Sequence, residues 1–391
     1  MSRRIGLAAS LSALCLMTGC WDRAELPEKG FVMGIAIDEG REGKISLATQ
    51  IYRPSQGVSS IGAKTAETAF VNITTEDKTV ARAIRDIPIN LGRKAQWSHI
   101  RLIMIGDKLA RKRPITELLE FFYRDHEPRL TIKFMITNGE AYPFLQLKPY
   151  IENTISQQLF QSEKAAAENS TKTIDMDLLK LGLQLKGETG NAVVPYLYET
   201  QEPLKRPEKT PNVAGLALLK KGKLVGVMDP SMVEYLQMLT GVYKNGMLDI
   251  PCRPSPEGRQ VKEVVEALNS QSRLQTSIGP ESATVRFQIK IDLALIELAC
   301  TKIKTSSDER KFAKQVEDTV RERIEETVDW MKEQKFDGIG LGNKINAKNP
   351  KLWKKWKPDW DSRFARTRFK IDVKVKLKTS GTTIGKPVFK K

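Results

Sequence analysis

The feature that most constrains this chain is a short apolar run that ends at a cysteine. Arg3 and Arg4 open the chain, residues 5–17 carry no charge, and Cys20 follows the small residues 18–19. A positive start, an apolar run of roughly 7–15 residues and small residues before the cut are typical of a secretory signal. The run is too short to cross a bilayer, which takes about 20 apolar residues. Residues 1–19 are therefore predicted to be a signal peptide.

Small residues directly before a cysteine form the bacterial lipobox pattern, in which the cysteine thiol carries a lipid; Met17 stands where leucine is usual. Each buried methylene of an acyl chain such as palmitate contributes about 0.8 kcal/mol, and two or more chains hold a protein stably. The alternative is an ordinary signal peptide with a chance cysteine. We predict that Cys20 is the lipid attachment site, and that the rest is a globular ectodomain at the outer face of a bacterial membrane.

The chain has 391 residues and a formal net charge of +17, which becomes +15 once Arg3 and Arg4 leave with the signal. This length allows two or three domains. An exported chain meets no nucleic acid routinely, so the charge favours attraction to anionic lipid or to acidic wall polymer. Solubility alone is an equally plain explanation.

Cysteine and histidine are scarce. Cys252 and Cys300 remain after processing, and they form either one disulfide or two unrelated buried thiols. His99 stands before an apolar strand pattern and His126 in a polar turn, and neither belongs to a metal-ligand motif. Both are expected to be structural.

No sequence motif of catalysis is found. The chain lacks HExxH, GxSxG, SxxK and P-loop patterns. The glycines of residues 338–342 follow a predicted helix, with no good helix start after them, whereas a dinucleotide loop needs strand, glycines and helix in that order. We therefore predict no enzyme, no catalytic residue, no cofactor and no metal.

The N-terminal half alternates strand and helix patterns. Residues 30–38 and 44–52 read as a hairpin, and a helix is expected near 77–87, ended by Pro88. A strand, a helix from Pro114, and a second strand follow, then two helical stretches and an apolar strand that ends near 199. Such an order predicts a sheet with packed helices.

A proline-rich, charged segment with no apolar period is expected to be a linker. Beyond it come a strand pair, a short helix, a long alternating strand and one helix of about 26 residues, roughly 39 Å long. Ser306 and Glu309 suit a capping box at its start. The predicted class is α+β, a multi-domain ectodomain of mixed sheets with packed helices. Its divisions are 1–19 signal, 20–200 N-terminal region with room for two subdomains, 201–212 linker, and 213–391 C-terminal domain with the long helix.

The segment "KNPKLWKKWKPDW" interleaves tryptophans with lysines. Tryptophan favours the headgroup region and lysine favours anionic lipid, which would make Trp353, Lys354, Lys355 and Trp356 a membrane- or partner-facing patch. The interpretation we favour is that the tryptophans pack inside the protein, because residues three apart share one face of a helical turn.

Several motifs together resemble one family. They are "GCWDRAEL", "FVMGIAID", "QIYRPS", "NLGRKAQWSHIRLIMIGDKLA", "LLEFFYRDHEPRL", "GLALLKKGKLVGVMD", "FDGIGLGNKINAKNPKLWKKW" and "FKIDVKVKLKTSG". In this order, over nearly the whole chain, they resemble the C-subunit lipoproteins of bacterial spore germinant receptors, the Ger(x)C family.

The resemblance implies a non-enzymatic receptor subunit needed for spore germination, on the outer face of the spore's inner membrane beside two integral membrane subunits. It implies an α+β fold, and only Cys20 carries over as a functional position. One alternative is a solute-binding lipoprotein of an importer, which would need two β/α lobes around a cleft. The other is a wall-active hydrolase, which two isolated histidines disfavour.

Overall fold

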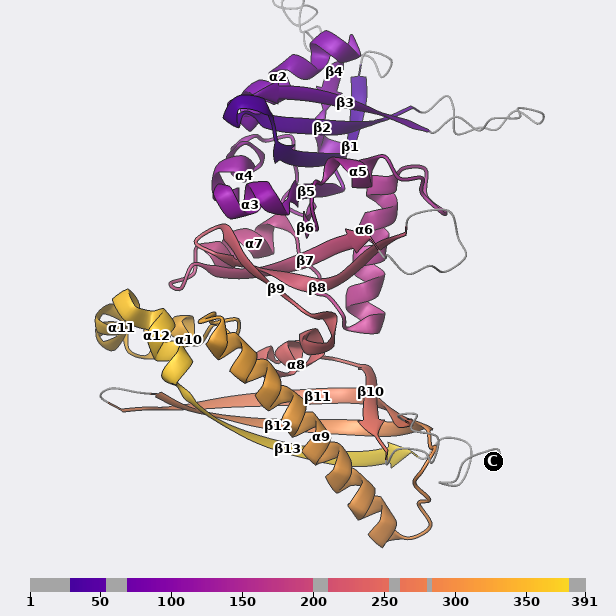
Figure 1. The fold of residues 1–391 in the computed structure, drawn as a ribbon, viewed down its shortest axis with the longest axis vertical. Helices are drawn as coiled ribbons and strands as arrows, with labels where there is room; N and C mark the ends of the chain where they lie inside the picture. The colour runs from indigo at the N-terminus through magenta and orange to yellow at the C-terminus, as the bar shows by residue number, and fades with distance from the viewer. Residues whose placement is uncertain (1–28, 54–68, 200–209, 253–260, 280–282, 380–391) are drawn as a thin grey trace, which may run out of the picture.

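A computed structural model gives the structure of the chain and describes residues 29–53, 69–199, 210–252, 261–279 and 283–379. Two sheets with packed helices make up the described chain, so the fold is α+β as predicted. The first sheet and its helices occupy one end of the long axis and the second sheet the other, with the short helices of residues 230–240 and 341–366 between them (Figure 1).

The first sheet has nine strands in the order β3-β2-β1-β5-β6-β7-β8-β9, with β4 paired to β1. Strands β1, β5, β6 and β7 are parallel neighbours, and the outer pairs are antiparallel. The strand bounds are β1 (Lys29–Glu39), β2 (Ile45–Tyr52), β3 (Phe70–Asp77), β4 (Lys94–Gln96), β5 (Leu102–Gly106), β6 (Lys133–Thr137), β7 (Asn191–Glu199), β8 (Pro211–Lys220) and β9 (Lys223–Met228). The predicted hairpin is confirmed as β1 and β2.

Helices cover both faces of this sheet. One core holds the apolar stripes of α2 (Val80–Leu91), α3 (Asp107–Lys112), α4 (Ile115–Arg124) and α7 (Leu178–Leu185). The other core holds α5 (Tyr142–Leu145) and α6 (Ile155–Ala165). Because neighbouring residues of a strand point to opposite faces, Ile35 packs in the first core and Ala36 in the second. Strands β5 and β6 are buried at every position, as expected for central parallel strands.

The prediction that Pro88 ends its helix is wrong. Helix α2 continues through Pro88 to Leu91 and ends at Gly92, whose positive φ of 66° suits glycine. A proline in a helix loses one hydrogen bond to the preceding turn. Here Ile84 and Ile87 are buried on the sheet side, and this packing holds the helix together across the proline.

The second sheet has the order β10-β11-β12-β13, and β12 and β13 are parallel. Its strands are β10 (Gly246–Pro251), β11 (Lys262–Ile278), β12 (Ala283–Glu297) and β13 (Arg368–Thr379). The long helix α9 (Ser306–Glu333) is confirmed, and its predicted stripe is buried against the sheet: Phe312, Val316, Val320, Ile324, Val328 and Met331. A shorter helix, α8 (Pro230–Thr240), precedes the sheet. After α9, the short helices α10 (Leu341–Lys348), α11 (Pro350–Trp356) and α12 (Trp360–Arg366) lead into β13.

The two sheets do not divide at the predicted linker. Strands β8 and β9 lie beyond it and complete the first sheet, so the division between the sheets comes after Met228. Leu218 of β8 and Met228 of β9 also pack in the core of α8, α9 and the second sheet. Of the linker itself, residues 201–209 lie outside the described residues.

Two expectations about helix starts are corrected. The capping box of α9 uses Thr305 and Asp308 and not Ser306 and Glu309. A helix, α10, does begin among the glycines of 338–342, at Leu341. A helix and not a strand precedes them, so the dinucleotide arrangement is still not formed. In the described ranges, no helix has both the length and the apolar character needed to cross a membrane.

Candidate functional site

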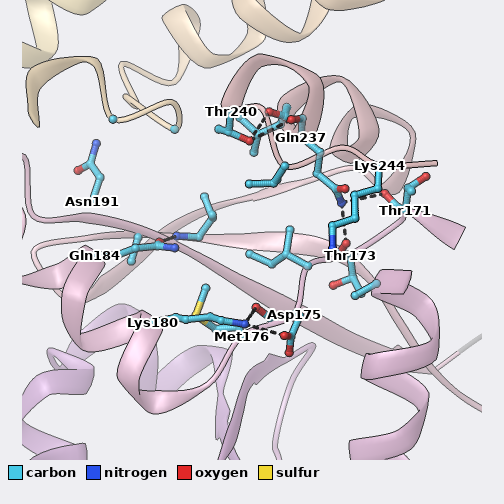
Figure 2. Close-up of a pocket in the computed structure, with 18 of the residues that line it drawn as sticks. Thr171, Thr173, Asp175, Met176, Lys180, Gln184, Asn191, Gln237, Thr240 and Lys244 are labelled. Atoms are coloured by element: carbon cyan, nitrogen blue, oxygen red, sulfur yellow. Dashed lines mark hydrogen bonds and ion pairs between the residues drawn. The ribbon is translucent and has the colours of Figure 1, made fainter. Parts of the chain in front are cut away.

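A cavity lies where the first sheet meets the C-terminal half. It has a volume of about 820 Å³, and its walls come from the turn after α6, the segment before α7, α7, β7, α8 and the loop after α9. Figure 2 shows side chains from these elements pointing toward one another across it. We call it the junction pocket. Pockets of a few hundred Å³ or more that lie between domains are a preferred place for ligands.

One wall of the junction pocket is built by an irregular turn. Helix α6 runs on into a single π turn, Ala166–Ser170, and then reaches Thr171 with a positive φ of 54°. The Gln237 amide of α8 donates hydrogen bonds to the carbonyls of Thr171, at 3.4 Å, and Thr173, at 2.8 Å (Figure 2). Threonine in the left-handed region is strained, so this contact helps to hold the turn.

An ion network with buried Lys133 and Glu163 supports the segment before α7, which also lines the pocket. Lys133 Nζ lies 3.0 Å from Glu163 Oε2 and also pairs with Asp175, which Lys180 reaches at 2.6 Å. Burial raises the pKa of Glu163, and the charge of Lys133 opposes that shift. The other oxygen of Glu163 accepts the Met176 N–H at 2.8 Å. The network fixes the segment before α7 against α6.

A fully buried carboxylate, that of Asp337, forms the far side of the pocket. Its two oxygens accept the N–H groups of Leu341, at 2.9 Å, and Gly342, at 2.8 Å, and the Trp360 indole N–H at 3.1 Å. Burial raises the pKa of Asp337, and these hydrogen bonds oppose the shift. The Asn191 amide of β7 donates to the Asp337 carbonyl at 3.3 Å, which joins the first sheet to the C-terminal half.

The junction pocket therefore presents amides, hydroxyls and ammonium groups, with apolar patches between them. Such a lining binds polar molecules through hydrogen bonds and charge. Sequence reasoning missed Asp337, Lys133 and Glu163. Only Asp337 had a signal in the sequence: it stands just before a glycine turn, and aspartate commonly caps a following helix.

The structure places the predicted site residues as follows. Cys20 lies outside the described residues. Trp353 and Trp356 are only 2% and 3% exposed, and both rings pack with Trp360. They lie inside the protein, as the favoured interpretation predicts. The alternative that both rings face a membrane is wrong. Lys354 and Lys355 are exposed.

The histidines and cysteines are also placed. His99 lies edge-on against the Phe31 ring, and His126 is exposed in the turn after α4. Cys252 and Cys300 form a disulfide, which settles the alternative left open by the sequence. Glu263 lies within reach of both sulfurs, but the sulfurs are bonded to each other and are not thiolate ligands for a metal.

Comparison with known proteins gives a consistent result. The family described as "Spore germination protein N-terminal domain" matches residues 22–198, and "Spore germination B3/ GerAC like, C-terminal" matches residues 214–381. Spore germination protein B3 of Bacillus subtilis is 26% identical over 383 residues, covering 96% of each chain. Spore germination protein KC of the same organism is 23% identical, covering 93% of this chain and 92% of its own.

A solved structure supports the same fold. The crystal structure of the GerBC protein superposes with a TM-score of 0.57 and 19% identity, covering 88% of this chain and 96% of that one. The likeness concerns the fold, since the identity is low. With the N-terminal and C-terminal family domains both present, in order, in one chain, this protein belongs to the Ger(x)C family of spore germination proteins.

Proposed function

We propose that this chain is the lipid-anchored, non-enzymatic C subunit of a nutrient germinant receptor and acts in spore germination. The observation that carries the proposal is the pair of family domains directly behind a lipobox: the first match begins at residue 22, next to Cys20. Its relatives over nearly the full length are spore germination proteins. The proposed place is the outer face of the spore's inner membrane, beside two integral membrane subunits.

Two features support a subunit that binds and does not catalyse. His99 packs on a phenylalanine ring and His126 lies on the surface, so neither histidine stands beside the junction pocket. The buried carboxylates of Asp337 and Glu163 accept hydrogen bonds from N–H groups of the same chain, and Glu163 also pairs with Lys133. These contacts fit a role in holding the subunit's shape.

The test is to replace Cys20→Ala and to use Cys15→Ala as the matched control, because Cys15 leaves with the signal. We expect Cys20→Ala to abolish the acyl mass increment and either to release the chain from membranes or to leave the precursor uncleaved. Spores with Cys20→Ala should lose much of their nutrient response, while Cys15→Ala spores germinate normally.

The readouts are intact mass, membrane fractionation and the rate of germination over a panel of nutrients. Unchanged mass and fractionation of Cys20→Ala would contradict the anchor. Normal germination on every nutrient by spores that lack the chain altogether would contradict the receptor role and favour a solute-binding lipoprotein.

A further inference from the structure

Helix α2 carries an exposed face on the side away from the sheet. The stripe begins at Arg82. Arg85 and Ile89 follow it by three and seven residues, so the three side chains lie along one side of the helix. All three are exposed, and the Ile89 side chain is 79% exposed, whereas the sheet side of the helix is buried. Ile89 is one of several exposed large apolar side chains of the described chain, and it lies on the same stripe as two arginines.

The charge of this face is not balanced by neighbours. Arg93 and Lys94 follow the helix after its cap at Gly92, and both are exposed. Among the described acidic residues, none forms an ion pair with Arg82, Arg85, Arg93 or Lys94. Asp86 is the one acid between residues 80 and 94, and it is half-buried. We call Arg82, Arg85, Ile89, Arg93 and Lys94 the basic face.

The basic face lies beside the point at which the described chain begins. Lys94 of β4 is paired in parallel with Lys29, the first residue of β1. The Leu91 side chain lies over Gly30 so closely that a Cβ there would come within 2.6 Å of it. Helix α2 and β4 accordingly lie together at one end of the molecule (Figure 1).

The chain between Cys20 and this end is short. Residues 21–28 separate Cys20 from Lys29. Fully extended, nine peptide steps reach at most about 30 Å. A lipid on Cys20 would therefore hold the basic face near the bilayer, and tethering raises the effective concentration of the face at the surface. At physiological salt the screening length is about 8 Å, so a basic face in contact with the membrane surface is attracted by the charge of anionic lipids.

We propose that the basic face docks on the anionic phospholipid surface of the bilayer that holds the Cys20 lipid, with Ile89 entering the headgroup layer. The proposal rests on the lipid anchor of the proposed function. It fixes an orientation that an anchor alone leaves free: the second sheet, at the other end of the long axis, points away from the membrane (Figure 1).

The test uses the chain from residue 20 with Cys20→Ser, which keeps every buried apolar residue of the described ranges, because these lie between Val32 and Val373. Its sedimentation is measured with vesicles of phosphatidylcholine alone and of phosphatidylcholine mixed with phosphatidylglycerol. The variant is Arg82→Glu/Arg85→Glu. The matched control is Lys354→Glu/Lys355→Glu, which makes the same charge change on exposed residues of α11. Thermal unfolding of each chain confirms that it is folded.

We expect binding only to vesicles with phosphatidylglycerol, and weaker binding as salt rises. Each basic residue at an anionic surface contributes about fivefold to partitioning, so Arg82→Glu/Arg85→Glu should lower it about 25-fold or more. The control should change it far less. A polarity-sensitive dye on Ile89→Cys should shift to the blue on binding, while the same dye on Lys354→Cys should not.

Equal losses for the two double variants, or no dye shift at residue 89, would overturn the docking face, as would binding that ignores phosphatidylglycerol. Because this chain carries no lipid, the result does not depend on modification of Cys20. The proposal that Cys20 carries the lipid anchor is tested separately: it is contradicted if Cys20→Ala fractionates with membranes as the wild type does.

Discussion

The carboxylate of Asp337 holds three segments of the C-terminal half together, since it accepts hydrogen bonds from the start of α10 and from Trp360 of α12. We predict that Asp337→Ala lowers the free energy of unfolding by about 3–5 kcal/mol, because three buried donors lose their acceptor. Urea unfolding followed by tryptophan fluorescence measures this loss.

The comparison variants are Asp337→Asn, which keeps one acceptor oxygen, and Asp329→Ala, which removes an exposed carboxylate of α9. We expect a smaller loss for the first and less than about 1 kcal/mol for the second. If Asp337→Ala is no worse than Asp329→Ala, the carboxylate does not have this stabilising role.

Glu234 of α8 is half-buried, and burial raises the pKa of its carboxyl from 4.5 to about 7. Its neighbours act in both directions: Tyr235 and Lys172 lower the pKa and Asp249 raises it. Between the unfolded and the folded pKa, the folded chain binds the proton more tightly. Stability from this group is therefore complete below the unfolded pKa and is lost as the pH rises through about 7.

We predict that Glu234→Gln removes this loss and is about 1–3 kcal/mol more stable than the wild type at mildly alkaline pH. Urea unfolding over a series of pH values measures the slope. Glu325→Gln, an exposed change on α9, is the control and should keep the wild-type slope. A wild-type slope in Glu234→Gln would show that the proton is taken up elsewhere.

At the scale of elements, the start of α9 shows how closely a sequence motif has to be read. Thr305 Oγ1 accepts the Asp308 N–H at 3.2 Å, and Asp308 accepts the Thr305 N–H at 2.9 Å. We predict that Thr305→Ala lowers the free energy of unfolding by about 1 kcal/mol, the usual value of an N-cap. Ser306→Ala, one residue along, should cost less than about 0.5 kcal/mol. Thermal unfolding measures both, and a larger loss in Ser306→Ala would restore the sequence-based assignment.

Elements with a strong apolar period were predictable from the sequence, and the others were not. Helix α9 and strands β1, β2 and β12 each repeat apolar residues at the right spacing. Strand β11 was missed because its second half, from Leu268, is mostly polar, and its positions there are exposed or half-buried and never fully buried. It exists because β10 and β12 pair with it on both sides. A local sequence pattern does not identify the distant strands with which a segment pairs.

The candidate site was less predictable than the fold. Asp337, Glu163 and Gln237 act through partners that the topology brings to them from other elements. A local sequence window contains none of those partners. Trp353 and Trp356 were interpretable, because their spacing places both rings on one side of α11, where the core lies.

At the scale of the whole molecule, β8 and β9 join the two halves. Their residues Leu216 and Leu218 are fully buried against the C-terminal half, while Ala217 and Leu219 are buried in the first core. We predict that a chain ending at Glu199, one residue beyond the match to the N-terminal family domain, shows no cooperative unfolding, because β7 is left without its antiparallel neighbour. A chain ending at Asp229 keeps all nine strands and should unfold cooperatively, though at lower temperature than the full chain.

Circular dichroism during heating compares the two shortened chains with the full one. Equal, cooperative transitions for the chains ending at 199 and at 229 would show that the first sheet closes without β8 and β9.

Because β13 pairs in parallel with β12, the second sheet is not complete until β13 has joined it. Thr284 lies opposite Arg368, so α9–α12 must emerge before these strands can meet. Pairing over such a separation is slow. In a chain that is secreted with its lipid end first, one edge of β12 would therefore stay unpaired until β13 emerges. An unpaired strand edge can pair with a strand of another chain. The strand that finally closes this edge exposes Lys370, Lys374, Lys376 and Lys378, and these charges discourage any further strand from adding to it.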